Sequence, residues 1–452
     1  MKSLEFPQKY KPIIDKLTKT AKDNGYVIYA VGGFVRDIIL KRVPNDLDIM
    51  VEGENAGIKF SKLVAETLNI HPPITFERFA TSKLLIDGKE IEFIMPRKEY
   101  YDKNSRNPET RIGTLEQDAL RRDFTVNALF LRLNDLTLLD LTQKGLKDIE
   151  NKIIRVTDET ASDTIFEQDP LRILRAVRQS FQLNFKIEEK TYRSMKNKAE
   201  RIKIVSGERI RDEINKILMF EKPSNAFCML DDIGMLEIIL PELKKTQGIC
   251  QPLQYHDKDV FCHTMDVIDK VKADLPLRVA ALLHDVGKPD TINEKGGKIS
   301  FIGHELKSAQ KTKYILSRLK YSADFIKQVC FLIENHMYPK MYTSDWKDSS
   351  VRKFADKMSD NLENVELLNI ADGKLHNGEL FDRVRKLKKQ NLLLPERELF
   401  NGNELASIFG RPAGKWIGEA KSYIKRLQFE NPKLTKEEAV KKLKNMLKIQ
   451  RI

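Results

Sequence analysis

Two short motifs near the N-terminus carry residue types that could hold a nucleoside triphosphate. Gly32 and Gly33 follow an apolar run over residues 27–31, and glycine lets the backbone approach phosphate oxygens that a Cβ would block. Asp46 and Asp48 are two residues apart, so on an extended segment both carboxylates point the same way while apolar neighbours face the core. Such a pair suits Mg²⁺, which takes few protein ligands and completes its shell with phosphate and water. The pattern predicts a site for a metal-bound nucleotide.

The order of these motifs is more informative than either motif alone. Most Asp-x-Asp pairs are solvated turn residues, and most Gly-Gly pairs are simple turns. Here the glycine turn is followed by a predicted short helix over residues 34–40, and the Asp pair lies on the next predicted strand. This order resembles the nucleotidyltransferase superfamily that includes DNA polymerase β. A second block, Arg121 to Ala128 (RRDFTVNA), resembles the ribose- and phosphate-contacting motif of class II tRNA nucleotidyltransferases and bacterial poly(A) polymerases.

The second block supplies side chains for the sugar and the phosphates. Arg121 and Arg122 are fixed cations for triphosphate charge, Asp123 can accept hydrogen bonds from ribose hydroxyls, and Asn127 can bind a base or sugar edge. Without the upstream Asp pair, this block would be an ordinary solvated helix end. Glu92 lies on a predicted strand near the place where the superfamily keeps a third carboxylate. The resemblance therefore implies the catalytic set Asp46, Asp48 and Glu92, with Gly32, Gly33 and Arg36 also binding the nucleotide.

A third block, residues 167–178 (EQDPLRILRAVR), could select the base. Asp169, Arg172 and Arg175 lie on one predicted helical face by three-residue steps. Alone, the segment would be an ordinary helix with intrahelical ion pairs. It resembles the segment by which class II enzymes read C or A through Watson–Crick-like bonds in place of a template. The resemblance implies that Asp169, Arg172, Arg175 and Arg178 bind the nucleotide.

One residue of this block departs from the family pattern. The family usually has Glu beside the Asp, and here that position is Gln168. The ion pair expected to hold Arg172 is then missing, unless Glu167 supplies it.

Five of the seven histidines fall between His256 and His336. The order His…His-Asp…His…His…Asp resembles the HD phosphohydrolases and is made by His263, His284, Asp285, His304, His336 and Asp372. Imidazole nitrogen with carboxylate oxygen suits Mn²⁺, Fe²⁺, Ni²⁺ or Zn²⁺, and six ligands could hold two metals with a bridging water as the nucleophile. Lys288 could hold a phosphate. The remaining histidines are predicted to be ordinary packed residues: His71, His256 and His376.

The elements that position these residues divide the chain into an α/β part and a helical part. Up to about residue 156 predicted strands alternate with helices, and from Ile165 onward helical periodicity dominates. The predicted strands lie near residues 27–31, 47–51, 82–86, 90–95 and 127–133. The polar stretch from Tyr100 to Gly113 is predicted to be a mobile loop. The fold class expected is an α/β nucleotidyltransferase head (polymerase β-like), an all-α neck and body, an all-α HD domain and a helical tail.

Four domains are expected in a chain of 452 residues, which is long enough to bury a core in each. They are a nucleotidyltransferase head (1–156), a neck and body for base selection and tRNA binding (157–245), an HD metal-dependent phosphohydrolase domain (246–394) and a C-terminal tail for tRNA binding (395–452). The stretches Ser206 to Ile210 and Gly410 to Gly418 also follow the family's order.

Charge and cysteine usage indicate the partner and the compartment. The chain carries 79 Lys and Arg against 66 Asp and Glu, a net charge of +13 that favours a polyanionic partner. The 4 cysteines show no Cys-x-x-Cys spacing, so we expect reduced thiols in the cytosol. No signal peptide or membrane-spanning run is recognisable, and we expect a cytoplasmic protein without a membrane partner.

The resemblance implies template-independent CCA addition to tRNA 3′ ends, with CTP, ATP and Mg²⁺. Residues 46–53 (DLDIMVEG) look like the CCA-adding branch, because poly(A) polymerases of this class usually carry a DFDVAT-type sequence there. A poly(A) polymerase and a partial CC- or A-adding enzyme stay open as alternatives. A non-catalytic RNA-binding protein, or an HD hydrolase with a vestigial head, is disfavoured by the intact Asp pair. For the HD segment we expect hydrolysis of a phosphoester at an RNA end.

Overall fold

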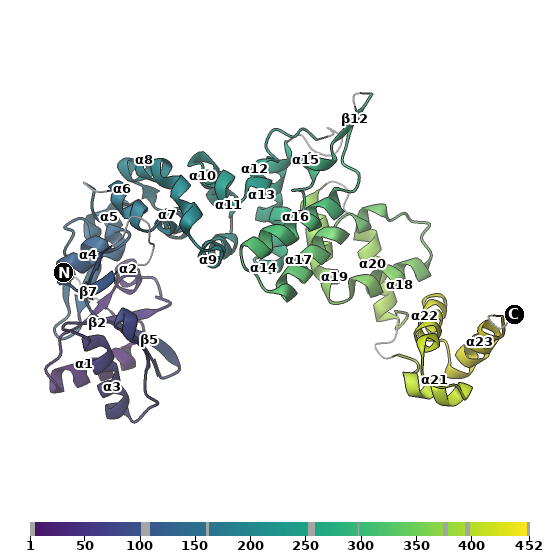
Figure 1. Cartoon of the computed structure of the whole chain (residues 1–452), viewed down its shortest axis with the longest axis horizontal. Helices are drawn as coiled ribbons and strands as arrows, with labels where there is room; N and C mark the ends of the chain where they lie inside the picture. Colours follow the sequence, from purple (N-terminus) through teal and green to yellow (C-terminus); the bar gives the residue numbers. More distant parts are fainter. Residues whose placement is uncertain are drawn as a thin grey trace. The chain divides into compact units, whose positions relative to one another are not determined.

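The computed structural model describes residues 5–100, 109–159, 162–251, 258–296, 298–373, 378–393 and 398–449 (Figure 1). The chain divides into two compact units. One comprises Met1–Phe220 and Asn225–Pro241, and the other comprises Glu221–Ser224 and Glu242–Ile452. The three predicted boundaries between the four domains stay predictions.

A seven-stranded mixed sheet forms the centre of the head, in the order β3-β4-β5-β2-β1-β8-β9. Its strands are β1 (Ile28–Val31), β2 (Leu47–Val51), β3 (Ile74–Phe76), β4 (Thr81–Ile86), β5 (Lys89–Ile94), β8 (Leu129–Arg132) and β9 (Thr137–Asp140). β2 and β5 are parallel, and the other neighbours are antiparallel. All four residues of β1 are buried, because apolar side chains leave from both faces of this central strand.

Short helices accompany the sheet and confirm the predicted α/β head. They are α1 (Lys11–Asp23), α2 (Gly33–Ile39), α3 (Ala56–Leu68), α4 (Leu115–Arg121) and α5 (Gly145–Asn151). α2 begins directly after the glycine turn, as the sequence predicts. α4 begins with a capping box in which Thr114 and Gln117 satisfy each other's backbone N–H groups.

The prediction of a mobile loop from Tyr100 to Gly113 is wrong in part. Strands β6 (Arg97–Tyr100) and β7 (Glu109–Ile112) form an antiparallel hairpin, and residues 101–108 lie outside the described range. The ladder pairs Lys98 with Arg111, so strongly polar residues occupy both strands. The β6–β7 hairpin was therefore not predicted, because this stretch has few apolar residues.

Helices make up the rest of the first unit, as predicted. They are α6 (Ser162–Gln168), α7 (Leu171–Leu183), α8 (Glu189–Lys198), α9 (Gly207–Leu218), α10 (Ser224–Asp232), α11 (Leu236–Ile239) and α12 (Pro241–Lys244), some of which reach into the second unit. The short strands β10 (Ile153–Ile154) and β11 (Lys186–Ile187) pair in parallel and tie the end of the head to the end of α7.

The second unit is helical apart from one hairpin of β12 (Asn293–Lys295) and β13 (Lys298–Ser300). Its first helices are α13 (Val260–Lys270), α14 (Leu275–Leu283), α15 (Lys288–Thr291), α16 (His304–Arg318), α17 (Ala323–Asn335), α18 (Asp348–Met358), α19 (Leu362–Asp372) and α20 (Gly378–Lys389). The last are α21 (Gly402–Phe409), α22 (Lys415–Glu430) and α23 (Lys436–Ile449), which bury a small core around Leu405 and Trp416. Among the described helices, none has the length and hydropathy needed to cross a bilayer.

Candidate functional site

The Asp pair lies at the start of β2, beside the third predicted carboxylate. Asp48 is paired in register with Val31 of β1 and with Glu92 of β5. Asp46 is exposed and directly precedes β2, and the apolar neighbours of both carboxylates are buried as predicted. We call Asp46, Asp48 and Glu92 the head carboxylates. Strand register brings them to adjacent positions at one place on the sheet.

The electrostatics of the head carboxylates favour a bound cation. Burial and the neighbouring Glu92 raise the pKa of Asp48 to about 6, against the lowering effect of Arg122. Asp46 raises it further. A half-buried carboxylate that repels two others is relieved by a divalent cation, so these three oxygen donors fit Mg²⁺.

Of the two predicted phosphate-binding arginines, Arg122 lies at the glycine turn. A Cβ built on Gly32, whose φ is +71°, would lie 3.1 Å from Arg122 Nη1. Arg122 Nε donates to Asp118 Oδ2 over 3.0 Å. Arg121 contacts the other oxygen of Asp118 at 2.5 Å and donates to the carbonyl of Arg97. The structure thus brings Arg122, and not Arg121, to the turn that precedes α2.

A buried polar network joins α2, the 3-10 turn Thr125–Asn127 and α7. Asp123 is 8% exposed and accepts hydrogen bonds from Asn127 Nδ2 at 2.9 Å and Arg175 Nη2 at 2.6 Å. Arg36 Nη1 donates to Asn127 Oδ1 over 2.6 Å, and Gln179 Oε1 accepts from Asn127 Nδ2 over 2.9 Å. Burial would raise the pKa of Asp123, but Arg175 and Asn127 lower it well below its ordinary value.

This network occupies two residues that were predicted to bind the nucleotide. The polar atoms of Asp123 and Asn127 are occupied within the protein, so direct contacts of these two residues with ribose or base stay predictions. Gln179 was missed by the sequence analysis. Its signal was available: it is a polar residue four positions after Arg175, within the buried stripe of α7.

The prediction that Asp169 shares a helical face with Arg172 and Arg175 is wrong. α6 ends at Gln168 and α7 begins at Leu171, so Asp169 lies in the break between them. Pro170 causes this break, because proline disfavours helical geometry at the preceding residue and starts the next helix well. Asp169 Oδ1 accepts a hydrogen bond from Leu171 N over 3.2 Å.

The arginines of α7 differ in how they are partnered. Arg172 is 7% exposed, and its Nη1 has no hydrogen-bond partner among the described residues. Arg178 is paired with Glu213 of α9 at 2.5 Å. Glu167 does not take the place of the missing family Glu, since it pairs with Lys198 at 2.5 Å. Arg172 therefore has a buried donor available for another acceptor.

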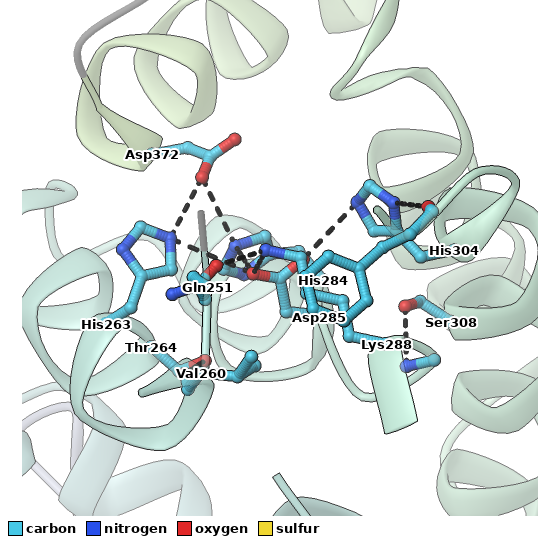
Figure 2. Close-up of polar contacts among 12 residues, drawn as sticks. Gln251, Val260, His263, Thr264, His284, Asp285, Lys288, His304, Ser308 and Asp372 are labelled. Carbon is cyan, nitrogen blue, oxygen red and sulfur yellow. Dashed lines mark hydrogen bonds and ion pairs between the residues drawn. The ribbon is translucent and has the colours of Figure 1, made fainter. Parts of the chain in front are cut away.

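All six predicted HD ligands meet at one place in the second unit. Figure 2 labels five of them: His263, His284, Asp285, His304 and Asp372. The six ligands come from α13 (His263), the end of α14 (His284 and Asp285), the start of α16 (His304), the end of α17 (His336) and the end of α19 (Asp372). Their donor atoms form two groups, each within 4.8 Å: His263, His284, Asp285 and Asp372, and Asp285, His304 and His336. Asp285 belongs to both groups. The arrangement offers donors for two ions that share one carboxylate.

Backbone carbonyl groups fix the hydrogen positions of three of these histidines. The Nδ1 atoms of His284, His304 and His336 lie 2.8, 2.7 and 2.6 Å from the carbonyl oxygen three residues earlier. A carbonyl oxygen only accepts, so each Nδ1 carries a hydrogen, and in the neutral ring each Nε2 keeps a lone pair. Nε2 is then the atom available to a metal.

Buried atoms without good partners show that this donor set fits a metal. His284 and Asp285 are 0% and 1% exposed, and His284 Nε2 and both oxygens of Asp285 lack a well-formed hydrogen bond among the described residues. Burial would lower the pKa of His284, but Asp285 and Asp372 raise it to about 10. A cation bound by nitrogen and oxygen would satisfy His284 Nε2 and the Asp285 oxygens.

Two lysines flank the two metal-binding carboxylates. Lys288 Nζ lies 2.7 Å from Asp285 Oδ2 and also donates to Gln251 Oε1 over 2.7 Å. Lys340 Nζ lies 2.5 Å from Asp372 Oδ2. Lys288 was predicted from the sequence, whereas Gln251 and Lys340 were not. Lys340 follows the fourth histidine ligand by one helical turn, which is the only sequence signal it carries.

The remaining histidines do not join this cluster in the described part of the chain. His71 is exposed before β3, so the prediction that it is packed is wrong. His256 and His376 lie outside the described residues.

Family models and relatives cover nearly the same span as these sites. Three models match: the Poly A polymerase head domain over residues 28–155, the probable RNA and SrmB- binding site of polymerase A over residues 184–246, and the HD domain over residues 255–377. The chain is 33% identical over 328 residues to an A-adding tRNA nucleotidyltransferase of Deinococcus radiodurans, covering 68% of this chain and 73% of the relative.

Two further similarities extend over almost the whole chain. A CC-adding tRNA nucleotidyltransferase of Thermus thermophilus is 27% identical over 433 residues, 91% of this chain and 92% of the relative. The solved structure of the Bacillus stearothermophilus CCA-adding enzyme in complex with CTP has a TM-score of 0.69 at 20% identity, covering 99% of each chain. This structural likeness supports the fold: an α/β head followed by helical parts.

Proposed function

The chain belongs to the family of tRNA nucleotidyltransferases that combine a Poly A polymerase head domain with an HD domain, and from this premise we propose that it adds C, C and A in turn to tRNA 3′ ends. Its activity as a nucleotidyltransferase follows from the family. The observation that carries the proposal is the position of the head carboxylates next to the glycine turn and Arg122. Relatives named A-adding and CC-adding keep a partial activity open.

In the proposed reaction the 3′-hydroxyl of tRNA attacks the α-phosphate of the nucleotide, and pyrophosphate leaves. Bound Mg²⁺ would activate that hydroxyl and neutralise the leaving pyrophosphate. Asp46, Asp48 and Glu92 would hold it. The turn at Gly32 lets backbone N–H groups approach the phosphates, and Arg122 supplies a fixed cation beside them.

Base selection is assigned to Asp169 and Arg172. Cytosine and adenine both present an exocyclic amino group beside an unprotonated ring nitrogen, whereas uracil and guanine present a carbonyl beside a ring N–H. A carboxylate that accepts from the amino group and an arginine that donates to the ring nitrogen fit only the first pair. The buried, unpartnered Nη1 of Arg172 supports this role.

The test is incubation of the full chain with tRNA that lacks CCA and with each labelled nucleotide. We expect incorporation of CTP and ATP, no incorporation of GTP or UTP, and a stop after CCA. A product that ends at CC, or an A added only to tRNA ending in CC, would identify a partial enzyme. A long A tail on arbitrary RNA would identify a poly(A) polymerase.

The tRNA itself is expected to bind through phosphate contacts of lysines and arginines on the helical parts, by shape more than by sequence.

Asp46→Ala or Asp48→Ala should abolish nucleotide addition and leave tRNA affinity nearly unchanged, because the metal acts on the transition state. Wild-type addition by either variant would contradict the two-carboxylate site.

A second activity is favoured by the HD cluster. We infer that it hydrolyses a phosphoester at an RNA end, such as a 2′,3′-cyclic phosphate or a 2′-phosphate. In this reaction a water oxygen bonds to phosphorus, one ribose P–O bond breaks, and the ribose oxygen leaves with a proton. Lys288 and Lys340 lie beside the metal-binding carboxylates, where cations could meet phosphate charge. A 2′,3′-cyclic phosphate would occupy the 3′-oxygen that the head needs, and a 2′-phosphate would lie next to it.

The hydrolase proposal is tested by loading the full chain with Mn²⁺, Ni²⁺, Fe²⁺ or Zn²⁺ and supplying RNA with either phosphate end. Release of the blocked end in a metal-dependent reaction is expected. If calorimetry detects no binding of these metals and no phosphoester is cleaved, the cluster is a structural remnant.

A further inference from the structure

An arginine to which the sequence analysis gave no role, Arg209 in the stretch from Ser206 to Ile210, contacts the carboxylate assigned to base selection. Arg209 lies in the first turn of α9, and its Nη2 is 2.7 Å from Asp169 Oδ2. The other oxygen, Oδ1, accepts from the backbone N–H of Leu171 over 3.2 Å. Both oxygens of Asp169 are thus held, one by the start of α7 and one by a different helix.

The base-reading block offers no other hold on this carboxylate among the described residues. Asp169 lies in the break between α6 and α7, where its N–H donates to the carbonyl of Ile165 over 3.3 Å and its carbonyl accepts from the N–H of Arg172 over 3.0 Å, so the backbone is held while the side chain needs its own partners. Gln168 is neutral where the family pattern has an acid, and Glu167 is engaged by Lys198. Arg172 keeps a buried donor without a partner. Within the block, Leu171 N–H holds Oδ1 of Asp169, and the hold on Oδ2 comes from Arg209, outside the block.

Helix α9 can hold the Asp169 carboxylate in place because a second ion pair connects the same helix to α7. Glu213 lies one turn after Arg209, so both side chains face the same way. Glu213 pairs with Arg178 of α7 at 2.5 Å, and its side chain is 4% exposed. The two ion pairs, Arg209 with Asp169 and Glu213 with Arg178, connect one face of α9 to α7 and to the residue just before it.

We propose that Arg209 is a positioning residue for nucleotide selection, because it holds the Asp169 carboxylate in the orientation that accepts from the amino group of C or A. The proposal rests on the assignment of base selection to Asp169 and Arg172. Arg209 touches neither the nucleotide nor the reacting atoms in this account. It holds the Asp169 carboxylate from another helix, whereas the acid that the family has at position 168 is expected to hold Arg172.

The pair is suited to orientation more than to stability. The side chains of Arg209 and Asp169 are 43% and 22% exposed. Ion pairs in such surroundings add little to the free energy of unfolding. Loss of Arg209 should leave the melting temperature nearly unchanged while the freed carboxylate samples other rotamers.

The first experiment compares Arg209→Gln with the wild-type enzyme on tRNA lacking CCA. We expect the ratio of kcat/KM for CTP to that for UTP to fall roughly tenfold, a loss of about 1.4 kcal/mol in discrimination. The change should appear mainly as a higher KM for CTP and ATP, with kcat within about twofold. Binding of CTP measured by calorimetry should weaken by a similar factor, and Arg209→Lys should recover part of the discrimination.

A matched control lies two residues further along the same helix. Arg211 is paired with its neighbour Asp212 at 2.9 Å, so Arg211→Gln removes the same charge from α9 without an ion pair to Asp169. Its base selection should equal that of the wild-type enzyme. Equal discrimination by Arg209→Gln and the wild-type enzyme, or equal losses in Arg209→Gln and Arg211→Gln, would overturn the proposal.

Asp169→Ala separates this inference from the function on which it rests. If Asp169→Ala relaxes base choice while Arg209→Gln does not, Asp169 reads the base and Arg209 has no positioning role. If Asp169→Ala leaves base choice unchanged, both the assignment of Asp169 and the role of Arg209 fail. Relaxed choice in both variants supports the proposal.

Discussion

At the scale of single residues, Asp123 joins the head to α7 through a carboxylate whose hydrogen bonds are all made inside the protein. Its partners are Asn127 in the head and Arg175 and Gln179 in α7. A buried carboxylate with fixed donors is costly to disturb, because its partners would lose their acceptor in a place that water hardly reaches.

We predict that Asp123→Asn lowers the free energy of unfolding by about 2 kcal/mol at neutral pH, since it takes the charged acceptor from Asn127 and from Arg175, whose side chain is 36% exposed. Urea unfolding followed by circular dichroism measures this loss. The exposed Asp135, paired with Arg132 beside the β8–β9 turn, provides the control, and Asp135→Asn should change the midpoint little.

The same carboxylate sets a pH dependence. The pKa of Asp123 is lower in the folded chain than in the unfolded chain, so its stabilising effect is fully present above about pH 4 and is lost as pH falls below that value. The difference in unfolding free energy between the wild-type chain and Asp123→Asn should therefore shrink on acidification. A difference that stays constant from neutral pH down to the acid transition would contradict the ion pair.

Individual residues also show what could be predicted from the sequence and what could not. Alternation along a strand predicted that Asp46 and Asp48 share a face, and strand register places Glu92 beside Asp48. The sequence cannot decide which of the adjacent residues Arg121 and Arg122 lies at the glycine turn, because ion pairs with Asp118 orient both side chains. Gln179 lies in no predicted motif and Arg209 lies in a stretch to which no role was assigned, so only packing between distant segments reveals their contacts.

At the scale of elements, the break before α7 decides where Asp169 points. We predict that Pro170→Ala lets α6 and α7 join, because alanine favours the helix and removes the restriction on the preceding residue. Discrimination between CTP and UTP should fall by roughly tenfold, with little loss of stability. Pro12→Ala, in the first turn of α1, is the matched control and should not change nucleotide choice.

A second element contact holds the HD cluster together. A Cβ at Gly287 would lie 2.5 Å from Ser308 N and 2.7 Å from His304 O, so α15 and α16 approach at a position only glycine permits. His304 Nε2 lies 3.4 Å from Asp285 Oδ1 in this arrangement. Ser308 is labelled in Figure 2 on the helix that carries His304.

We predict that Gly287→Ala pushes the start of α16 away from Asp285 and weakens the group formed by Asp285, His304 and His336. Bound transition metal should fall from about two ions per chain to about one, as measured by elemental analysis. Gly418→Ala in α22, where a Cβ would meet nothing within 4 Å, should keep the wild-type metal content. A wild-type metal content in Gly287→Ala would show that metal binding does not depend on the close approach of α15 and α16.

Elements with strong periodicity were predictable, and those made by polar residues were not. The apolar runs of β1, β2, β4, β5 and β8 were predicted within a residue or two of their ends. The β6–β7 hairpin was taken for a loop, because its ladder is built from charged side chains that carry no apolar alternation. The break at Pro170 was overlooked because three-residue steps also fit an unbroken helix.

At the scale of the whole molecule, the head carboxylates and the HD cluster belong to different compact units. They also use different donors: oxygen alone in the head, and nitrogen with oxygen in the HD cluster. We therefore predict that the double variant His284→Ala with Asp285→Ala loses bound transition metal and phosphoester hydrolysis while it adds nucleotides at the wild-type rate.

The converse variant, Asp46→Ala with Asp48→Ala, should keep its transition metal and its hydrolysis while nucleotide addition disappears. Parallel assays of both reactions on both variants check this. Loss of nucleotide addition on removal of the HD ligands would show that the two units depend on each other.

Asp285 lies in both groups of donors at the HD cluster, and this sharing makes the two halves unequal. One half offers four protein ligands and the other offers three, so the first ion should enter the four-ligand half and orient the carboxylate for the second. Filling would then be sequential, and scarce transition metal would leave a half-loaded hydrolase. Nucleotide addition, for which we propose Mg²⁺ at the head carboxylates, would continue during such scarcity. The chain would then extend intact tRNA ends while blocked ends accumulate until the metal supply recovers.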